Sequence, residues 1–157
     1  MFMPKVLSWT SRCLSIASLM LLVSILQAKE PELEAFSVTT SDGKVVEYQV
    51  EIARTMSQMR RGLMFRDSMP ENQGMLFIYQ PERIATMWMK NTILSLDMLF
   101  IDSNGLIVNI AENTTPFSLD RISSGQAIRA VVELNAGQVE KHGIQIGDRA
   151  THPLFEQ

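Results

Sequence analysis

The sequence predicts a mainly β, β-rich α+β fold: a compact antiparallel barrel-like or curled sheet of about seven or eight short strands with two short helices. Short alternating or continuously apolar runs recur between turn-forming Gly, Asn, Asp and Pro residues. No helical stretch is long enough to cross over between parallel strands. These two observations favour antiparallel neighbours.

The first elements are a hairpin and a short helix. Residues 36–40 and 46–52 alternate between apolar and polar side chains, and Ser41-Asp42-Gly43-Lys44 separates them as a turn. Thr55 with Gln58 three residues later matches a capping box, and Gly62 is a typical helix end. The spacing predicts a helix over about Met56–Arg61.

The rest of the chain alternates strands and turns. The turn signals are Gln80–Arg83 and Ser103-Asn104-Gly105, and residues 112–126 are loop-like. The strands are expected at residues 75–79, 84–89, 93–102, 106–110 and 127–134, with a last one through Thr151, and a short helix is expected at residues 138–142.

The amino terminus has the pattern of a secretory signal peptide. Lys5 and Arg12 precede the uncharged apolar run Cys13–Leu26, and charge returns at Lys29-Glu30. The run has 14 residues, fewer than the roughly 20 that span a bilayer, which disfavours the alternative of an uncleaved anchor. We expect a signal peptide over residues 1–28, a disordered tether over 29–34 and a single domain over 35–157. The protein would then be periplasmic in a Gram-negative host and secreted otherwise, with no stable membrane span after cleavage.

Charge and cysteine content exclude several classes of function. The leader holds two of the 14 basic residues and none of the 17 acidic ones, so the remainder has a net charge of −5. This balance argues against a nucleic-acid partner, which needs a clustered basic surface. The single cysteine, Cys13, lies in the leader, so the exported domain must fold without disulfides. We expect a monomer without a cofactor.

The common catalytic signatures are absent from the sequence. It contains no GxxxxGK[ST], GxGxxG, GxSxG, HExxH or paired CxxC motif. A metal site at the two histidines, His142 and His152, would need a third, acidic ligand held in an ordered position. The sequence indicates no such ligand, and we interpret both histidines as surface residues.

Asp97 is the most informative polar residue. It shares a strand side with Leu99 and Ile101, so strand parity directs its carboxylate toward a dry interior, where it needs donors. The expected donors are the nearby Lys90, Asn91 and Thr92, or Arg61 and Arg66 from the helix region. A structural polar cluster is favoured over a catalytic one.

Methionine is unusually frequent, with eight residues after the leader. Met87 and Met89 flank Trp88, and thioethers beside an aromatic ring could bind Cu(I) in an oxidising compartment. Because these methionines stand among Leu, Phe and Ile, filling of the core is the favoured interpretation, and no metal is expected.

Several ordered motifs resemble one family. The chain is similar, over about Val45 to Ala150, to the DUF192 family of small, often exported proteins, although Ile93-Leu94-Ser95-Leu96 lacks the proline that the family often has before its Leu-Asp pair. The resemblance implies a compact β-rich domain with short helices, and it implies no activity, cofactor or substrate. The motifs that carry it are Arg61-Gly62-Leu63-Met64-Phe65-Arg66, Gly74-Met75-Leu76-Phe77, Trp88-Met89-Lys90-Asn91-Thr92, Leu96-Asp97, Phe100-Ile101-Asp102 and Glu133-Leu134-Asn135-Ala136-Gly137.

Three functions remain open at this point. The first is a non-catalytic binding module for a small molecule, peptide or envelope partner. The second is a hydrolase of an envelope component, with Asp97 or Glu133 as general base and Lys90 or Arg66 stabilising negative charge. The third is Cu(I) handling through Met87 and Met89. The candidate ligand-binding or buried polar residues are Arg61, Arg66, Trp88, Lys90, Asn91, Thr92, Asp97 and Glu133.

Overall fold

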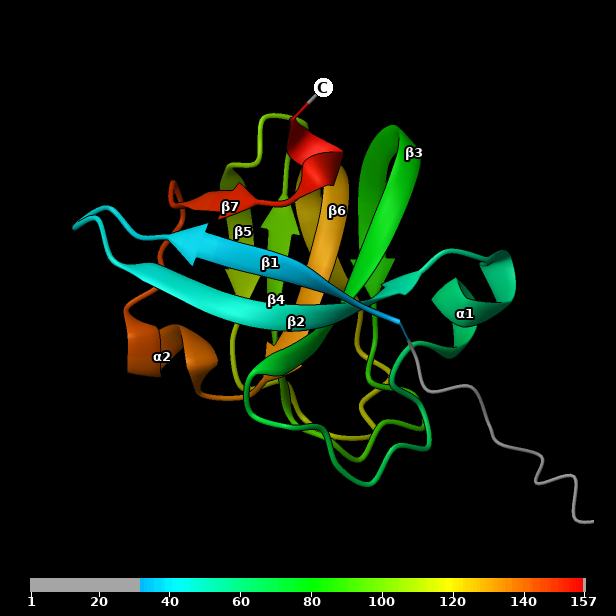
Figure 1. Cartoon of the computed structure of the whole chain (residues 1–157). Helices are drawn as coiled ribbons and strands as arrows, with labels where there is room; N and C mark the ends of the chain where they lie inside the picture. Colours follow the sequence, from blue (N-terminus) through cyan, green and yellow to red (C-terminus); the bar gives the residue numbers. More distant parts are fainter. Residues whose placement is uncertain (1–31, 157) are drawn as a thin grey trace, which may run out of the picture. The chain divides into compact units, whose positions relative to one another are not determined.

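Seven strands form one sheet in the computed structural model, which describes residues 32–156 (Figure 1). Two short α-helices and one 3-10 turn complete these residues, and the mainly β prediction is confirmed. In chain order the elements are β1 (Leu33–Thr39), β2 (Val45–Ala53), α1 (Met56–Arg61), β3 (Gln73–Met87), β4 (Leu96–Ile101), β5 (Ile107–Ala111), β6 (Ile122–Asn135), α2 (Gln138–His142), β7 (Arg149–Thr151) and η1 (Pro153–Phe155).

The sheet curls until its two edge strands nearly meet. The strand order is β5-β4-β6-β3-β2-β1-β7, and every neighbouring pair is antiparallel except β2 and β3. Beside the edges, Leu106 bridges Arg149, and Ala150 N–H donates to the Gly105 carbonyl at 2.7 Å. Gly105 has φ +79°, and a Cβ there would lie 2.7 Å from the Ala150 carbonyl oxygen. Only glycine therefore fits this seam, which closes most of the barrel.

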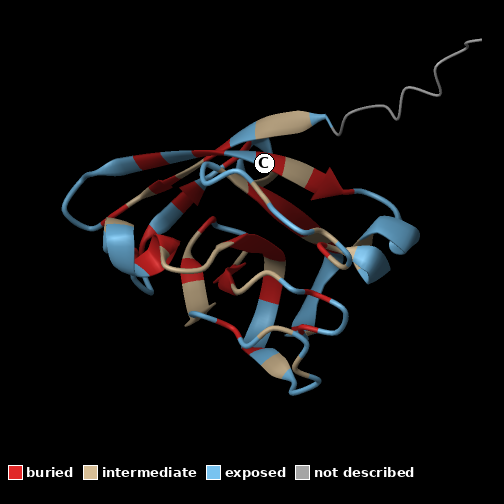
Figure 2. Ribbon diagram, turned by 90° about the horizontal axis from the view of Figure 1, so that it is seen from below, coloured by how far each residue is buried: buried red, intermediate tan, exposed pale blue. Residues whose placement is uncertain are grey.

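Two apolar clusters lie on opposite faces of the central strands. The interior cluster is dominated by aliphatic residues of all seven strands, with Phe36 and Tyr48 as its aromatic members. The outer cluster covers the other face of β3, β4 and β6 and holds Met75, Met89 and Met98 together with Phe77, Phe100 and Tyr79. Figure 2 shows buried residues concentrated on the strands, while α1 and the hairpin tips are exposed.

The elements predicted from short-range signals are present. The helix Met56–Arg61 has the predicted capping box, since the Thr55 side chain accepts from Gln58 N–H and the Gln58 side chain accepts from Thr55 N–H. The hairpin of β1 and β2 and the short helix Gln138–His142 are also confirmed. The capping box of α1 and the turn of the hairpin depend on contacts within a few residues.

Long-range pairing corrected four boundaries. Leu33 and Glu34, expected in a tether, belong to β1 because they pair with Glu51 and Val50. The turn expected at residues 80–83 is instead a register shift within the continuous strand β3. β6 begins at Ile122, inside the expected loop, because it continues along β3, and β4 begins at Leu96 rather than Ile93. The predicted signal peptide, residues 1–28, and residues 29–31 of the predicted tether lie outside the described residues.

His152 is buried, so its assignment to the surface was wrong. Its Nδ1 accepts from Leu154 N–H at 3.1 Å as the cap of η1, and its Nε2 lies 3.3 Å from a Glu34 carboxylate oxygen. Burial lowers the pKa of His152, an effect that Glu34 opposes. His142 is half-exposed, with Nδ1 3.2 Å from Lys44 Nζ.

Candidate functional site

Asp97 lies inside the barrel and holds two backbone N–H groups. It is 0% exposed and shares its side of β4 with Leu99 and Ile101 of the interior cluster, as parity predicted. One carboxylate oxygen accepts from Asn113 N–H at 2.8 Å and the other from Val139 N–H at 2.9 Å. Gly137 gives α2 no side-chain cap, so Asp97 caps this helix from a distant strand.

The expected donors to Asp97 were wrong. Neither Lys90, Asn91 and Thr92 nor Arg61 and Arg66 donate to it among the hydrogen bonds of the described residues. The first backbone N–H groups of a helix lack partners within that helix and attract a carboxylate. Folding brings this helix end to β4 from more than 40 residues away. Asp97 therefore connects β4 to the start of α2 and to the Asn113 backbone.

Glu133 lies on the neighbouring strand and points to the opposite face. Val132 and Leu134 belong to the interior cluster, so Glu133 between them faces outward, opposite Met98 on β4 and Met75 on β3. The side chain is only 5% exposed. Within residues 32–156 its carboxyl makes no hydrogen bond and no ion pair. Burial raises its pKa to about 8, so the group is mostly protonated at neutral pH.

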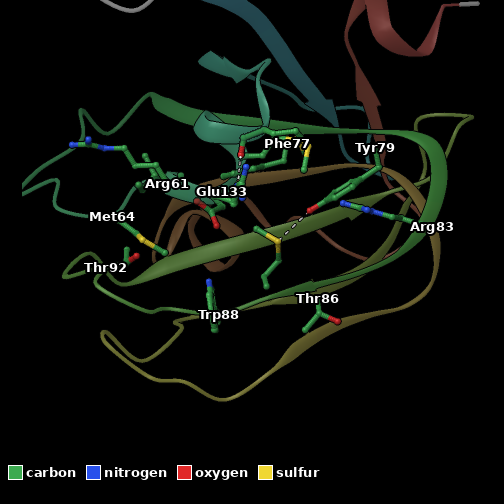
Figure 3. A pocket seen from close by; sticks show the side chains of 15 residues that line it. Arg61, Met64, Phe77, Tyr79, Arg83, Thr86, Trp88, Thr92 and Glu133 are labelled. Carbon is green, nitrogen blue, oxygen red and sulfur yellow. Dashed lines mark hydrogen bonds between the residues drawn. The ribbon is translucent and has the colours of Figure 1, made fainter.

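An open pocket of about 260 Å³ surrounds Glu133. It lies between α1 and the outer face of β3 and β6, with one side formed by the segment after β3. In Figure 3, Arg61 and Arg83 lie on opposite sides of Glu133, and Trp88 and Thr86 lie along a third side. The lining residues are Met56, Met59, Arg60, Arg61, Gly62, Leu63, Met64, Phe77, Tyr79, Arg83, Thr86, Met87, Trp88, Thr92 and Glu133.

Two hydroxyl groups of the pocket, those of Tyr79 and Thr92, bond to other protein atoms. Tyr79 donates to Met87 Sδ at 3.4 Å, and Thr92 donates to the Lys90 carbonyl at 3.2 Å. Burial raises the pKa of Tyr79, an effect that the nearby Arg83 opposes and Glu133 reinforces. Tyr79 is thus a neutral phenol near pH 7, and Glu133 is the pocket's one carboxyl group, with no hydrogen-bond partner among the described residues.

Four of the eight candidate residues line this pocket, and four do not. Arg61, Trp88, Thr92 and Glu133 come together there. Among the others, Arg66 pairs with Glu51, and the Lys90 ammonium lies 5.3 Å from the centre of the Trp88 ring. Asn91, with φ +54°, uses its backbone carbonyl to accept from Phe65 N–H at 2.9 Å.

Three loops beside the pocket expose large apolar side chains. The loops are joined because Phe65 N–H donates to Asn91, Phe117 N–H to Thr92, and Met89 N–H to Ser118, each through a backbone carbonyl. Phe65 and Phe117 both have positive φ and are 68% and 58% exposed. We call the exposed side chains of these loops the apolar rim: Phe65, Trp88, Ile93, Phe117 and Leu119.

Seven of the eight methionines after residue 28 fall into two groups. Met75, Met89 and Met98 are buried in the outer cluster, as core filling predicted, and Met89 Sδ accepts from the Thr114 hydroxyl at 3.2 Å. The other group lines the pocket and consists of Met56, Met59, Met64 and Met87. Met89, the second candidate Cu(I) ligand, does not line the pocket with Met87. Across residues 32–156, no three His, Cys, Asp or Glu side chains gather as metal ligands.

Most of the pocket wall consists of residues that the sequence pattern did not predict. Tyr79 and Arg83 come from the bulged half of β3, and Met56, Met59 and Arg60 come from α1. One signal was available: Glu133 interrupts the apolar run Val131–Leu134 on the strand face opposite to Val132 and Leu134. That position predicts a second buried carboxyl, distinct from Asp97.

No helix in the described part of the chain is long and apolar enough to cross a membrane.

Comparisons with known proteins place the chain in a family without assigned function. The DUF192 family model, described as "Uncharacterized ACR", matches residues 37–152. A search of curated proteins finds no match. A solved structure from Sinorhizobium meliloti 1021, titled a "putative transcription regulator", is 44% identical with a TM-score of 0.74, covering 76% of this chain and 92% of that one. A protein of unknown function from Novosphingobium aromaticivorans DSM 12444 is 31% identical with a TM-score of 0.76, covering 80% and 89%. The chain belongs to the DUF192 family.

Proposed function

We propose that this protein is an exported, non-catalytic module that binds a small molecule in the pocket around Glu133. The observation that carries the proposal is a buried carboxyl that faces an open pocket and has no partner within the described residues. Burying such a group costs stability unless something hydrogen-bonds to it. Groups of this kind concentrate at functional sites, because a ligand can supply the missing partner.

The walls support binding of an apolar body. Leu63, Phe77 and Trp88 are joined by four methionines, whose flexible thioethers adapt to irregular shapes. Trp88 is the only tryptophan after the leader. It lines the pocket and is 48% exposed, so its fluorescence reports directly on occupancy.

A neutral fluorescent probe tests binding without presupposing the ligand's charge. N-phenyl-1-naphthylamine should bind with one-to-one stoichiometry and change the Trp88 emission. Thr86→Phe, which fills the pocket side, should abolish that binding. Thr151→Phe, at an exposed position of β7 outside the pocket, serves as the matched control and should bind the probe normally. Equal probe binding by both variants would contradict the proposal.

Hydrolysis is a second candidate, favoured by one observation. A carboxyl that is protonated near neutral pH can act as a general acid, and Glu133 has this property. Asp97 does not support the same role, because both of its oxygens accept backbone N–H groups inside the barrel. Turnover of p-nitrophenyl butyrate that disappears in Glu133→Gln and persists in Thr151→Phe would favour the enzyme, whereas equal background rates favour the binding module.

Export is part of the proposal and rests on the leader pattern of residues 1–28. Mass spectrometry of the protein recovered from the periplasm or medium should find a chain that begins at or near Lys29. An intact Met1 on a membrane-bound species would contradict cleavage.

A further inference from the structure

Three arginines surround the pocket without acidic partners. Within residues 32–156 the arginines that pair with carboxylates are Arg54 and Arg66, and neither lines this pocket. By contrast, Arg61 lies 6.0 Å from the centre of the Phe65 ring, Arg83 lies 4.8 Å from that of Tyr79, and Arg60 Nε donates to the Met56 carbonyl. None of the three guanidinium groups is therefore paired with a carboxylate among the described residues.

This local charge is opposite to that of the molecule. The chain after the leader has a net charge of −5. The one acidic residue among the pocket lining is Glu133, which is mostly neutral near pH 7 because it is buried. The pocket is thus a cationic site on an acidic protein, and such a site attracts and selects anions.

The apolar surface continues from the pocket onto its edge. Trp88 belongs both to the pocket and to the apolar rim, and Phe65 directly follows the lining residue Met64. A cavity of about 260 Å³ holds a polar head with part of a chain, and the rim offers further apolar contact beyond it. Cationic side chains accompany this path, since Lys90 lies over the Trp88 ring and Arg61 over the Phe65 ring.

We propose that the pocket binds an amphiphilic monoanion, a carboxylate with an apolar tail, whose head accepts a hydrogen bond from Glu133 between the guanidinium groups of Arg61 and Arg83. The tail lies along the pocket methionines toward Trp88 and the apolar rim. This inference rests on the proposed binding function and names the ligand class of the same pocket. A neutral carboxyl donates to a carboxylate, so the buried group gains the partner that the protein does not supply.

Binding of such an anion should weaken as the pH rises. The charged and titratable groups lining the pocket are Arg60 and Arg61 from α1, Tyr79 and Arg83 from β3, and Glu133 from β6. The strand neighbours of Glu133, Met75 and Met98, are uncharged. Arginine stays charged, and burial raises the pKa of Tyr79, so Glu133 is the lining group that changes charge between pH 6 and 9. Its ionisation places a negative charge against the anionic head and weakens binding.

Displacement of N-phenyl-1-naphthylamine by three twelve-carbon probes tests the ligand class. At pH 6.5, laurate should displace the probe at a concentration at least about tenfold lower than dodecanol or dodecylamine, since hydrogen bonds to charged groups are worth about that factor. Combining Arg61→Gln with Arg83→Gln should weaken laurate about tenfold and leave dodecanol unchanged. Arg149→Gln, at an exposed position outside the pocket, should have no effect.

A pH series tests the role of Glu133. Laurate binding should weaken about fivefold between pH 8 and 9, as one-proton linkage with a pKa of about 8 requires. Glu133→Gln should still bind laurate through its amide N–H but without this pH dependence. Tighter binding of dodecylamine, equal binding of laurate and dodecanol, or no displacement by any of them would overturn the ligand class. In each of these cases the binding of N-phenyl-1-naphthylamine would still support the proposed binding function. If N-phenyl-1-naphthylamine does not bind at all, both the binding function and the ligand class are refuted.

Discussion

Two buried carboxyl groups lie on adjacent strands and have opposite surroundings. Asp97 faces the barrel interior, where two backbone N–H groups satisfy it. Glu133 faces the outer pocket, where no described residue donates to it and burial raises its pKa to about 8. Burial of a carboxyl therefore does not by itself indicate function. The missing partner, together with access from a pocket, is what distinguishes Glu133.

Substitutions at the two carboxyls should change the free energy of unfolding in opposite directions. Glu133→Gln should stabilise the fold by roughly 3 to 5 kcal/mol at pH 8 and above, because the amide removes a buried ionising group. The folded-state pKa, about 8, is raised above the ordinary value of 4.5. The parent therefore loses stability as the pH rises through this window. Urea unfolding should show the variant's advantage growing by about 1.4 kcal/mol per pH unit from 4.5 to 8 and then levelling off. A constant difference across this range would contradict the uncompensated burial of Glu133.

Asp97→Ala should have the opposite sign. It leaves Asn113 N–H and Val139 N–H without acceptors, at a cost of roughly 2 to 5 kcal/mol in the free energy of unfolding. The variant should melt far lower than the parent, in a thermal scan followed by circular dichroism. A melting temperature equal to the parent's would show that these two hydrogen bonds contribute nothing.

The matched amide at the interior position should also destabilise the fold. In Asp97→Asn one oxygen still accepts an N–H, while the amide NH₂ faces the other N–H donor. We expect a destabilisation of roughly 1 to 3 kcal/mol, in contrast to the stabilising Glu133→Gln. The same urea unfolding series at pH 7 measures both variants. A stabilised Asp97→Asn would remove the distinction between the two sites.

The smallest effect concerns the two helix caps. Thr55 caps α1 locally, while Asp97 caps α2 from a distant strand. Thr55→Ala should cost about 1 kcal/mol, the usual value for a lost cap at an exposed helix start. Because α1 forms one wall of the pocket, binding of N-phenyl-1-naphthylamine should also weaken modestly. If Thr55→Ala lowered the free energy of unfolding as much as Asp97→Ala, the local cap would stabilise more of the fold than one helix end.

The fold was predictable where local patterns decide it. Alternation, turn residues and the capping box of Thr55 and Gln58 predicted the hairpin, α1, α2 and the mainly antiparallel sheet. The parallel pairing of β2 with β3 and the early start of β6 at Ile122 depend on partners far along the chain. A single sequence contains no local signal for such pairings.

The candidate site was predictable only in part. Parity correctly buried Asp97 but could not identify its donors, because these are backbone groups 16 and 42 residues away rather than side chains. Glu133 was among the candidates, yet its pocket depends on how α1 and the bulged half of β3 approach β6. Composition does not encode that approach, so Tyr79, Arg83 and the α1 methionines were missed.

The ionisation of Glu133 can be measured directly by titration. Carbon-detected NMR of the side-chain carboxyl groups, with the Glu133 signal assigned by its absence in Glu133→Gln, gives the midpoint of each transition. We predict that Glu133 titrates near pH 8, as burial without a partner requires. A midpoint near the ordinary glutamate value of 4.5 would show that the carboxyl is solvated or compensated, and would contradict the account of the pocket.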